Sequence, residues 1–452
     1  MHIVMEGIVI LVIAAFALRG ISRPFAGLLG LLVVYIVQPG ELYPALAPLH
    51  LERSLAVFVL LSFFLHGNKL RFPAATRWFL AFYGAMLIAI PLAFWRGNSI
   101  QFCISFVEIV VFHLLIVAMV STEERLKRFV VLTVALIGWL GGTALLLYVQ
   151  GVRIVTMGIE RSSGITSSGG DPNTLGITLV TAMPLEFLMM SKGNGKWVRL
   201  LGLGVFLLSL ETIITTGSRT SFFAVMFLLL LLVMFDFKRK AKFLPLLLVA
   251  LPLMWLVIPE QYKARYETVD NLKDDDSYQN RVLSWQGGIQ MFLHNPLTGV
   301  GPDNYTDANG SKYWPGRGQK HWLNAHSLFF KLIGELGIVG VITFGGYLFC
   351  LFRLNLRMSR LWKERGGSVM TVKFPVYCNM SLLLLLMTGY SAHNLYRSTW
   401  FILGAVSGAL SLFEAQRSAQ TAVPVKKPMV GLWVPGAEEA TPQLEASTTW
   451  HG

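Results

Sequence analysis

Charged residues and cysteines are scarce in this chain. Of its 452 residues 14% are charged and 54% are hydrophobic, whereas about 25% of the residues of a soluble globular protein are charged. The three cysteines (Cys103, Cys350 and Cys378) lie in or beside apolar runs, which excludes a disulfide-rich scaffold and favours buried thiols. A compact basic domain is lacking, so the net charge of +13 indicates contact with anionic membrane lipids and no nucleic acid.

Long apolar runs are abundant instead. Each is close to the ~20 residues that a helix needs to cross a bilayer, where backbone hydrogen bonds must be formed internally. The sequence therefore predicts an all-α polytopic membrane protein with about 12–14 transmembrane helices. The first run has no clear cleavage site after it, so we expect a span and not a signal peptide. The runs lie at 3–18, 24–38, 54–66, 78–95, 102–120, 127–149, 173–190, 197–214, 219–235, 243–258, 327–352, 375–391 and 395–413.

Basic residues alternate between successive connections. The connections after every second run hold clusters, for example at 125–128 and 238–242, whereas the intervening connections hold one or two arginines. Positive charge collects in cytoplasmic connections. The pattern therefore predicts an N-terminus outside, a C-terminus inside, and the one long loop outside.

Composition divides the chain into four parts. We predict the N-terminal part of a transmembrane helical bundle at 1–258, a long periplasmic or extracytoplasmic loop at 259–325, the C-terminal part of the bundle at 326–413, and a disordered cytoplasmic tail at 414–452. The loop is rich in Asp, Asn, Tyr, Trp, Gly and Pro and has a helical pattern near 280–293. Long loops on a rigid scaffold usually carry function, so we expect the functional site there.

Three residues in or beside this loop are candidates for chemistry. Arg219 follows a Gly-Ser turn at the head of an apolar run, where backbone N–H groups and the helix dipole favour an anion. The alternative is an arginine that only reaches the lipid headgroups. His326 heads another apolar run and has the pKa range of a general base, although a histidine there also suits a polar cap. Arg281 begins an amphipathic stretch, and its alternative is a solvated loop arginine.

Other polar residues near this boundary are weaker candidates. Asp171 and Asn173 suit a turn and a helix N-cap, or the lining of a wet cavity for substrate. His321 is a second candidate for contact with the substrate, and His294 and His393 are weaker ones.

Acidic residues form no recognisable metal motif. The run Asp274–Asp276 does not match a calcium loop and is typical of a solvated segment. Glu108, Glu186 and Glu211 lie within apolar runs, where a carboxylate is costly and must face a partner or water. Glu211 is a candidate ion-pair partner for Arg219, and whether these acids act or only pair stays open.

Four motifs together resemble the O-antigen ligase and polymerase superfamily, membrane proteins that transfer or polymerise lipid-linked bacterial glycans. DPNTLG (171–176) heads one apolar run and GSRTSFF (217–223) heads another. The loop contains W-x-x-G-x-x-M-F-x-x-N-P-L-T-G-V-G at 285–301. The fourth motif is His326 and Ser327, nine residues, Gly337, two residues and Gly340. The resemblance covers roughly 160–410.

The resemblance implies a GT-C-like glycosyltransferase of the bacterial inner membrane, with a periplasmic active site and no metal or cofactor. The donor would be a glycan on undecaprenyl diphosphate. His326 would be the base that activates an acceptor hydroxyl, and Arg219 and Arg281 would bind the diphosphate and stabilise its leaving charge. Attack opposite the leaving group would invert the anomeric centre. We expect Asp171 and Asn173 to contact the substrate.

Three acceptors are compatible with such a donor site. A ligase transfers the glycan to lipid A–core, a polymerase transfers it to another lipid-linked repeat, and an O-oligosaccharyltransferase transfers it to protein Ser or Thr. The His–Ser pair favours the ligase, and no protein-docking domain is visible in the sequence. A transporter or flippase would instead place its charged site near the bilayer centre, and a scaffold without chemistry would tolerate the loss of His326.

Overall fold

The structure is a computed structural model that describes residues 2–156, 158–166, 169–235, 276–316 and 321–421. The chain divides into two compact units, residues 1–414 and residues 415–452. Of the second unit the structure describes residues 415–421, which are helical. The bundle and the candidate site lie in the first unit.

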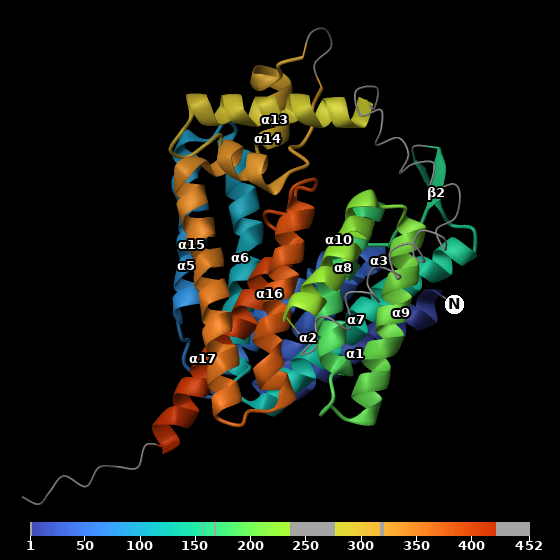
Figure 1. The fold of residues 1–452 in the computed structure, drawn as a ribbon, viewed down its shortest axis with the longest axis vertical. Helices are drawn as coiled ribbons and strands as arrows, with labels where there is room; N and C mark the ends of the chain where they lie inside the picture. Colours follow the sequence, from blue (N-terminus) through green and yellow to red (C-terminus); the bar gives the residue numbers. More distant parts are fainter. Residues whose placement is uncertain (1, 157, 167–168, 236–275, 317–320, 422–452) are drawn as a thin grey trace, which may run out of the picture. The chain divides into compact units, whose positions relative to one another are not determined.

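Helices make up most of the described chain (Figure 1). Two short strands, β1 (Ile154–Thr156) and β2 (Ile159–Arg161), form an antiparallel hairpin in which Ile154 lies opposite Arg161. The short helical turns are η1 (Pro44–Leu49), η2 (Ile90–Leu92) and a π-helical turn, η4 (Asn309–Tyr313). The α-helices are α1 (His2–Ser22), α2 (Pro24–Val37), α3 (Pro39–Leu42), α4 (Leu51–Leu65), α5 (Ala74–Ala89), α6 (Arg96–Met119), α7 (Glu123–Val149), α8 (Pro172–Met190), α9 (Lys196–Thr216), α10 (Arg219–Phe235), α13 (Asp276–His294), α14 (Tyr305–Ala308), α15 (Leu328–Glu364), α16 (Val369–Gly389) and α17 (Ser398–Thr421).

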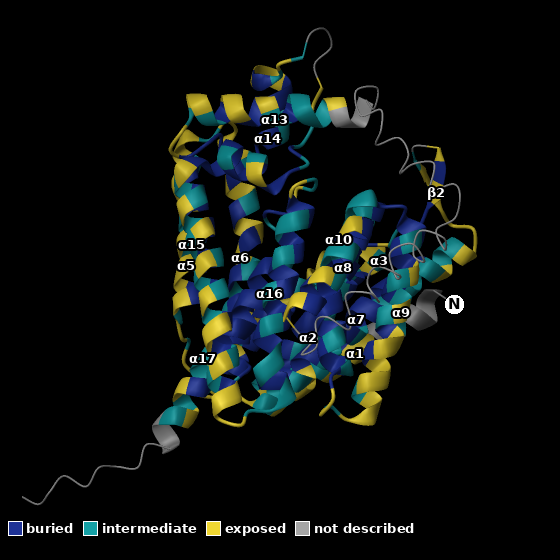
Figure 2. Ribbon diagram, viewed as in Figure 1, coloured by how far each residue is buried: buried dark blue, intermediate teal, exposed yellow. Residues whose placement is uncertain are grey.

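The protein is an all-α polytopic membrane protein, as predicted. Ten of the described helices are long and apolar enough to cross a bilayer, and two further apolar helices are shorter. Every predicted apolar run falls in a helix except the run at 243–258, which lies outside the described residues. Large apolar side chains such as Leu207 and Phe349 are 55% and 63% exposed, which in water would be costly and in lipid is expected (Figure 2).

The connections between the helices meet in two groups. In one group, Phe94 N donates to Val300 O at 2.8 Å, and Ser162 N donates to Thr215 O at 2.9 Å. All four residues lie in, or within a turn of, connections that the charge pattern predicts outside. The other group joins segments that the charge pattern predicts inside. Lys373 Nζ, near the start of α16, donates to Ser191 Oγ of the α8–α9 connection at 3.3 Å. The side of the cell that each group faces stays a prediction.

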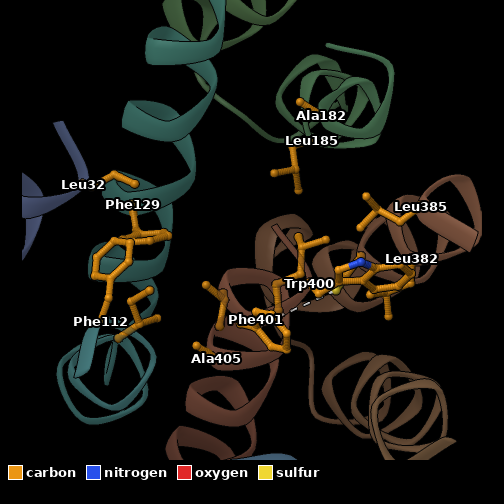
Figure 3. Close-up of a cluster of buried hydrophobic side chains, with 14 of the residues drawn as sticks. Leu32, Phe112, Phe129, Ala182, Leu185, Leu382, Leu385, Trp400, Phe401 and Ala405 are labelled. Carbon is orange, nitrogen blue, oxygen red and sulfur yellow. Dashed lines mark hydrogen bonds between the residues drawn. The ribbon is translucent and has the colours of Figure 1, made fainter. Parts of the chain in front are cut away.

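The core of the bundle is aromatic and aliphatic. Phe401 of α17 packs against Phe79 of α5, with ring centroids 4.6 Å apart, and against Phe106 of α6 at 5.4 Å. Figure 3 shows Phe401 beside Trp400 and Ala405 on α17. This contact between distant segments fixes α17, and with it the α16–α17 connection, on the N-terminal helices.

Candidate functional site

Helix α13 lies across the ends of α5, α6 and α15 (Figure 1). The predicted helical pattern near 280–293 is thus confirmed. Trp285 stacks on Phe330 at 5.2 Å, and its Nε1 donates to Ala325 O at 2.8 Å. A Cβ on Gly288 would lie 3.2 Å from the carbonyl oxygen of Phe330, so a small residue lets the two helices approach. Arg281, one turn before Trp285, is thereby held beside the histidine that follows Ala325.

The loop motif and the histidine motif form one interlocked unit. Helix α15 is broken at Gly337, which has φ 55° and ψ −153°. The break leaves backbone groups of α15 without partners inside the helix, and they form hydrogen bonds with the segment Pro296–Gly301. Ile338 N donates to Pro296 O at 2.8 Å, and Gly301 N donates to Glu335 O at 2.9 Å. A Cβ on Gly337 would lie 2.6 Å from Pro296 O, so a side chain at this position would push the segment away. The glycine of the signature is therefore required by this contact.

His326 lies just before α15 and is half-buried. Its φ of 44° is unusual for a residue with a side chain. Ser327 occupies the N-cap position and is fully buried, and its hydroxyl has no hydrogen-bond partner among the described residues. The His326 ring lies 5.3 Å from that of His393, with the planes at 70°. The strained backbone and the unused hydroxyl favour a functional role for this pair over a cap.

The surroundings of His326 keep its imidazole neutral. Burial lowers its pKa from the ordinary value, and the positive charge of Arg281 lowers it further. The carboxylate of Asp171 opposes these effects, and Lys331 adds to them. Three charged residues from separate segments thus act on one ring. A neutral imidazole at pH 7 can accept a proton, as a general base must.

Arg219 is the first residue of α10, as the sequence predicts. It follows Gly217, which has φ 56° and ends α9 with a left-handed turn. The hydroxyls of Thr220 and Ser391 lie 2.7 Å apart. Because Ser391 belongs to the α16–α17 connection that carries His393, the head of α10 lies at the same end of the bundle as His326.

A buried arginine that the sequence analysis did not select supports this turn. Arg161, 3% exposed, donates through Nε to Thr216 O at 2.6 Å and through Nη2 to Asn173 Oδ1 at 2.8 Å. The side-chain oxygen of Asn173, a predicted substrate contact, therefore already accepts a hydrogen bond from Arg161. The structure gives Asn173 a part in positioning the turn before Arg219.

Asp171 is the N-cap of α8, because its side chain accepts a hydrogen bond from Thr174 N at 2.8 Å. The predicted turn and cap are confirmed. Its carboxylate also acts on the pKa values of His326 and Arg397. Asp171 therefore lies among the charged groups of the site.

The sequence analysis missed a charged network that is buried except for Asp303. Lys331, 5% exposed, has its Nζ 3.6 Å from Glu335 Oε1 and 3.9 Å from Asp303 Oδ1. Tyr396 donates to Glu335 Oε2 at 2.7 Å. The network joins the break in α15, the loop and the α16–α17 connection. A lysine and a glutamate four residues apart in an apolar helix were a usable signal, since charges there are costly unless paired.

Other predicted residues have different neighbours. His321 is exposed, with its ring 5.2 Å from that of Trp314. His294 ends α13, about 20 Å along the helix axis from Arg281. The acidic run before α13 lies outside the described residues except for Asp276.

The acids inside the apolar runs have partners or are exposed. Arg53 Nε donates to Glu108 Oε1 at 2.5 Å, and Ser209 Oγ donates to Glu186 Oε1 at 2.9 Å. Glu211 is exposed on α9. Glu108 is therefore half of an ion pair, whereas Glu186 is fully buried and its Oε2 has no hydrogen-bond partner among the described residues.

Comparison with known proteins gives one family match. Residues 204–345 match the family model described as O-antigen ligase. The matched range contains Arg219, Arg281, His326 and the interlocked glycines, so the resemblance predicted from the motifs is confirmed over this region. A comparison with the curated proteins gives no match to this chain.

Proposed function

We propose that the chain transfers a glycan from undecaprenyl diphosphate to lipid A–core, because residues 204–345 match the family model described as O-antigen ligase. The reaction would take place at the outer face of the bacterial inner membrane. The observation that carries the proposal is geometric: the His326 ring lies 5.3 Å from that of His393, and Ser391 of the same connection lies 2.7 Å from Thr220, the neighbour of Arg219. Arg281 and Asp171 also act on the pKa of His326.

His326 supplies the base in this proposal. A ring nitrogen of the neutral imidazole takes the proton of the acceptor hydroxyl, and the oxygen attacks the anomeric carbon. The bond from that carbon to the diphosphate oxygen breaks on the opposite face, so the anomeric centre inverts. The imidazolium then returns its proton to water. The lowered pKa of His326 supports this role, because the base must be free of a proton before each turnover.

The arginines supply the positive charge that the leaving group needs. Undecaprenyl diphosphate gains negative charge as the bond breaks, and preorganised cations lower that barrier. Arg219 offers a guanidinium at a helix N-terminus, and Arg281 offers one that acts on the pKa of His326. The guanidinium fork fits phosphate oxygens better than an ammonium does.

The position of the cluster supports a transferase over a transporter. His326 precedes α15, Asp171 precedes α8 and His393 follows α16, so all lie in connections between spans. A transporter would hold its charged site near the bilayer centre.

The test is transfer by the purified protein from undecaprenyl-diphosphate glycan, with and without lipid A–core. We expect product on lipid A–core, abolished by His326→Ala and by Arg219→Ala. His294→Ala and Arg153→Ala are matched controls away from the cluster, and they should retain activity. Longer lipid-linked glycan without added acceptor would make the protein a polymerase, and product on a supplied protein would make it an O-oligosaccharyltransferase. Full activity of both site variants would refute the proposed site.

A further inference from the structure

An exposed tryptophan lies a few residues before the proposed base. Trp322 is 56% exposed, although an indole is among the side chains that gain most from burial. A Cβ on Gly310 would lie 2.5 Å from Cγ and Cδ2 of this indole and 2.6 Å from Cδ1. Three atoms of one ring at nearly equal distance place Gly310 over the face of the ring and not at its edge. One face of the indole therefore lies on the backbone of η4, and the exposed area belongs to the other face.

The backbone on both sides of this indole is attached to α13. Asn309 Nδ2, in the π-helical turn under the ring, donates to Leu323 O at 3.0 Å and to Ser284 Oγ at 3.3 Å. Ser284 Oγ in turn donates to Asn324 O at 3.0 Å. Turns of this kind are rare and are frequently found at functional sites. The turn that supports the indole and the segment that carries it are thus fixed to one helix, which holds the ring in place.

The same helix and the same segment lead to the proposed catalytic groups. Trp322 precedes His326 by four residues, so their Cα atoms lie within about 14 Å of each other. Ser284 follows Arg281 by three residues, which is about 4.5 Å along the axis of α13. In the proposed reaction the donor glycan begins at the carbon that is attacked and extends away from it. The exposed indole face is therefore within reach of a short oligosaccharide that starts at the site.

The surroundings of the indole suit a sugar ring better than lipid. A pyranose has an apolar face of C–H groups and a rim of hydroxyls, and an exposed aromatic face gives the C–H groups a flat apolar contact. Ser311 and Lys312 follow Gly310 and are exposed, and the exposed His321 precedes the indole. Such polar groups can form hydrogen bonds with hydroxyls at the rim. A tryptophan that anchors a protein in lipid would instead adjoin exposed apolar side chains.

We propose that Trp322 is a stacking platform for a sugar ring of the donor glycan, beyond the sugar that is attacked. This inference rests on the proposed function, and it adds a contact with the glycan to the contacts with the diphosphate. Trp322 is then a binding residue that orients the glycan. Its loss should weaken binding of the donor more than it slows the chemical step.

The kinetic test compares two lipid-linked donors with the purified full-length protein in lipid nanodiscs. One donor carries a complete repeat-unit oligosaccharide on undecaprenyl diphosphate, and the other carries a single sugar and is used as a competing inhibitor. Trp322→Ala should raise the KM of the first about tenfold with a smaller change in kcat, and Trp322→Phe should recover part of the loss. The inhibition constant of the second and the KM of lipid A–core should not change.

Saturation-transfer NMR gives a readout that needs no activity. The probe is the repeat-unit oligosaccharide released from the donor by mild acid, and the aromatic protons of the protein are irradiated. Sugar C–H protons should receive saturation from the wild type and lose most of it in Trp322→Ala. Gly310→Ala places a Cβ 2.5 Å from the ring and should displace the indole, with the same loss. Trp95→Ala is the matched control, because Trp95 is 58% exposed in another connection predicted outside, and it should keep the signal and the KM.

The outcomes separate this inference from the proposed function. His326→Ala should lose transfer yet keep the NMR signal, and Gly310→Ala still decides the question if Trp322→Ala does not fold. An equal effect of Trp322→Ala on both donors, or an effect on lipid A–core alone, would overturn the inference. So would a wild type without the NMR signal, or an unchanged signal in the folded variants, and these results would leave the transferase proposal intact. A wild type that saturates the oligosaccharide but transfers no glycan would refute the proposed function alone.

Discussion

Replacing Gly337 by alanine should loosen the joint between α15 and the loop. The backbone of Gly337 (φ 55°, ψ −153°) lies in a region that is almost restricted to glycine and costs other residues about 1–3 kcal/mol. The added Cβ would also lie 2.6 Å from Pro296 O and Leu297 O, so the segment must move. This movement strains the bonds from Ile338 N and Val339 N to those two oxygens, each worth about 0.5–1.5 kcal/mol. We expect Gly337→Ala to lose about 2–6 kcal/mol of stability in total.

The same helix provides a matched control for this prediction. A Cβ on Gly345 would have nothing within 4 Å, so Gly345→Ala should be neutral or stabilise the helix by up to about 1 kcal/mol. Thermal unfolding of both variants in nanodiscs, followed by chromatography of the soluble fraction, gives the comparison. Glycan transfer should fall in Gly337→Ala in parallel, because the segment that moves leads to Asp303 in the charged network. Equal unfolding midpoints for the two variants would refute the interlock as a stabilising contact.

Three further predictions concern the site. In a plot of kcat/KM against pH, activity should fall on the acid side with a midpoint below the ordinary histidine pKa of ~6.5, because burial and Arg281 lower the pKa of His326. Arg281→Gln should move this midpoint to higher pH. A wild-type midpoint above ~6.5 would contradict the prediction. Transfer should survive in EDTA, because arginines supply the cations, and loss that Mg²⁺ restores would contradict a metal-free reaction. Trp285→Phe should keep its stacking but leave Ala325 O without its donor, which costs about 1–3 kcal/mol of stability. Transfer should become about fivefold slower or more. The control Trp197→Phe, at an exposed position, should have no effect in the same transfer assay.

The sequence was informative where the chemistry is local. Long apolar runs must be helices in lipid, so the spans followed from composition alone. Asp171 could be predicted as an N-cap and Arg219 as the head of a helix, because each depends on its immediate neighbours. The partial charge of a helix terminus and the hydrogen bonds of a cap are properties of a few adjacent residues.

Contacts between distant segments were beyond this reasoning. Arg397 looks like an ordinary arginine in a short outer connection, and only tertiary packing buries it beside Asp171. The pairing of Pro296 with Ile338 needs two motifs to meet across 42 positions, which no local pattern encodes. The hydrogen bond that Asn173 accepts from Arg161 could not be predicted either, because it depends on how the hairpin folds back on α8. The parts of the site that escaped prediction are those made by the fold itself.

The joint between the loop and the broken helix has a consequence for how this region can change. Its hydrogen bonds run from backbone to backbone, between Pro296–Gly301 and Gly334–Val339, and the glycines at 299 and 337 let the two segments approach. The length of each segment is therefore fixed, because one insertion between Pro296 and Gly301 would shift every donor away from its acceptor. Residues 276–340 should therefore behave as a cassette that can be exchanged whole between related proteins. Transfer of the loop without the helix break, or of the break without the loop, should give a chain that does not assemble its site.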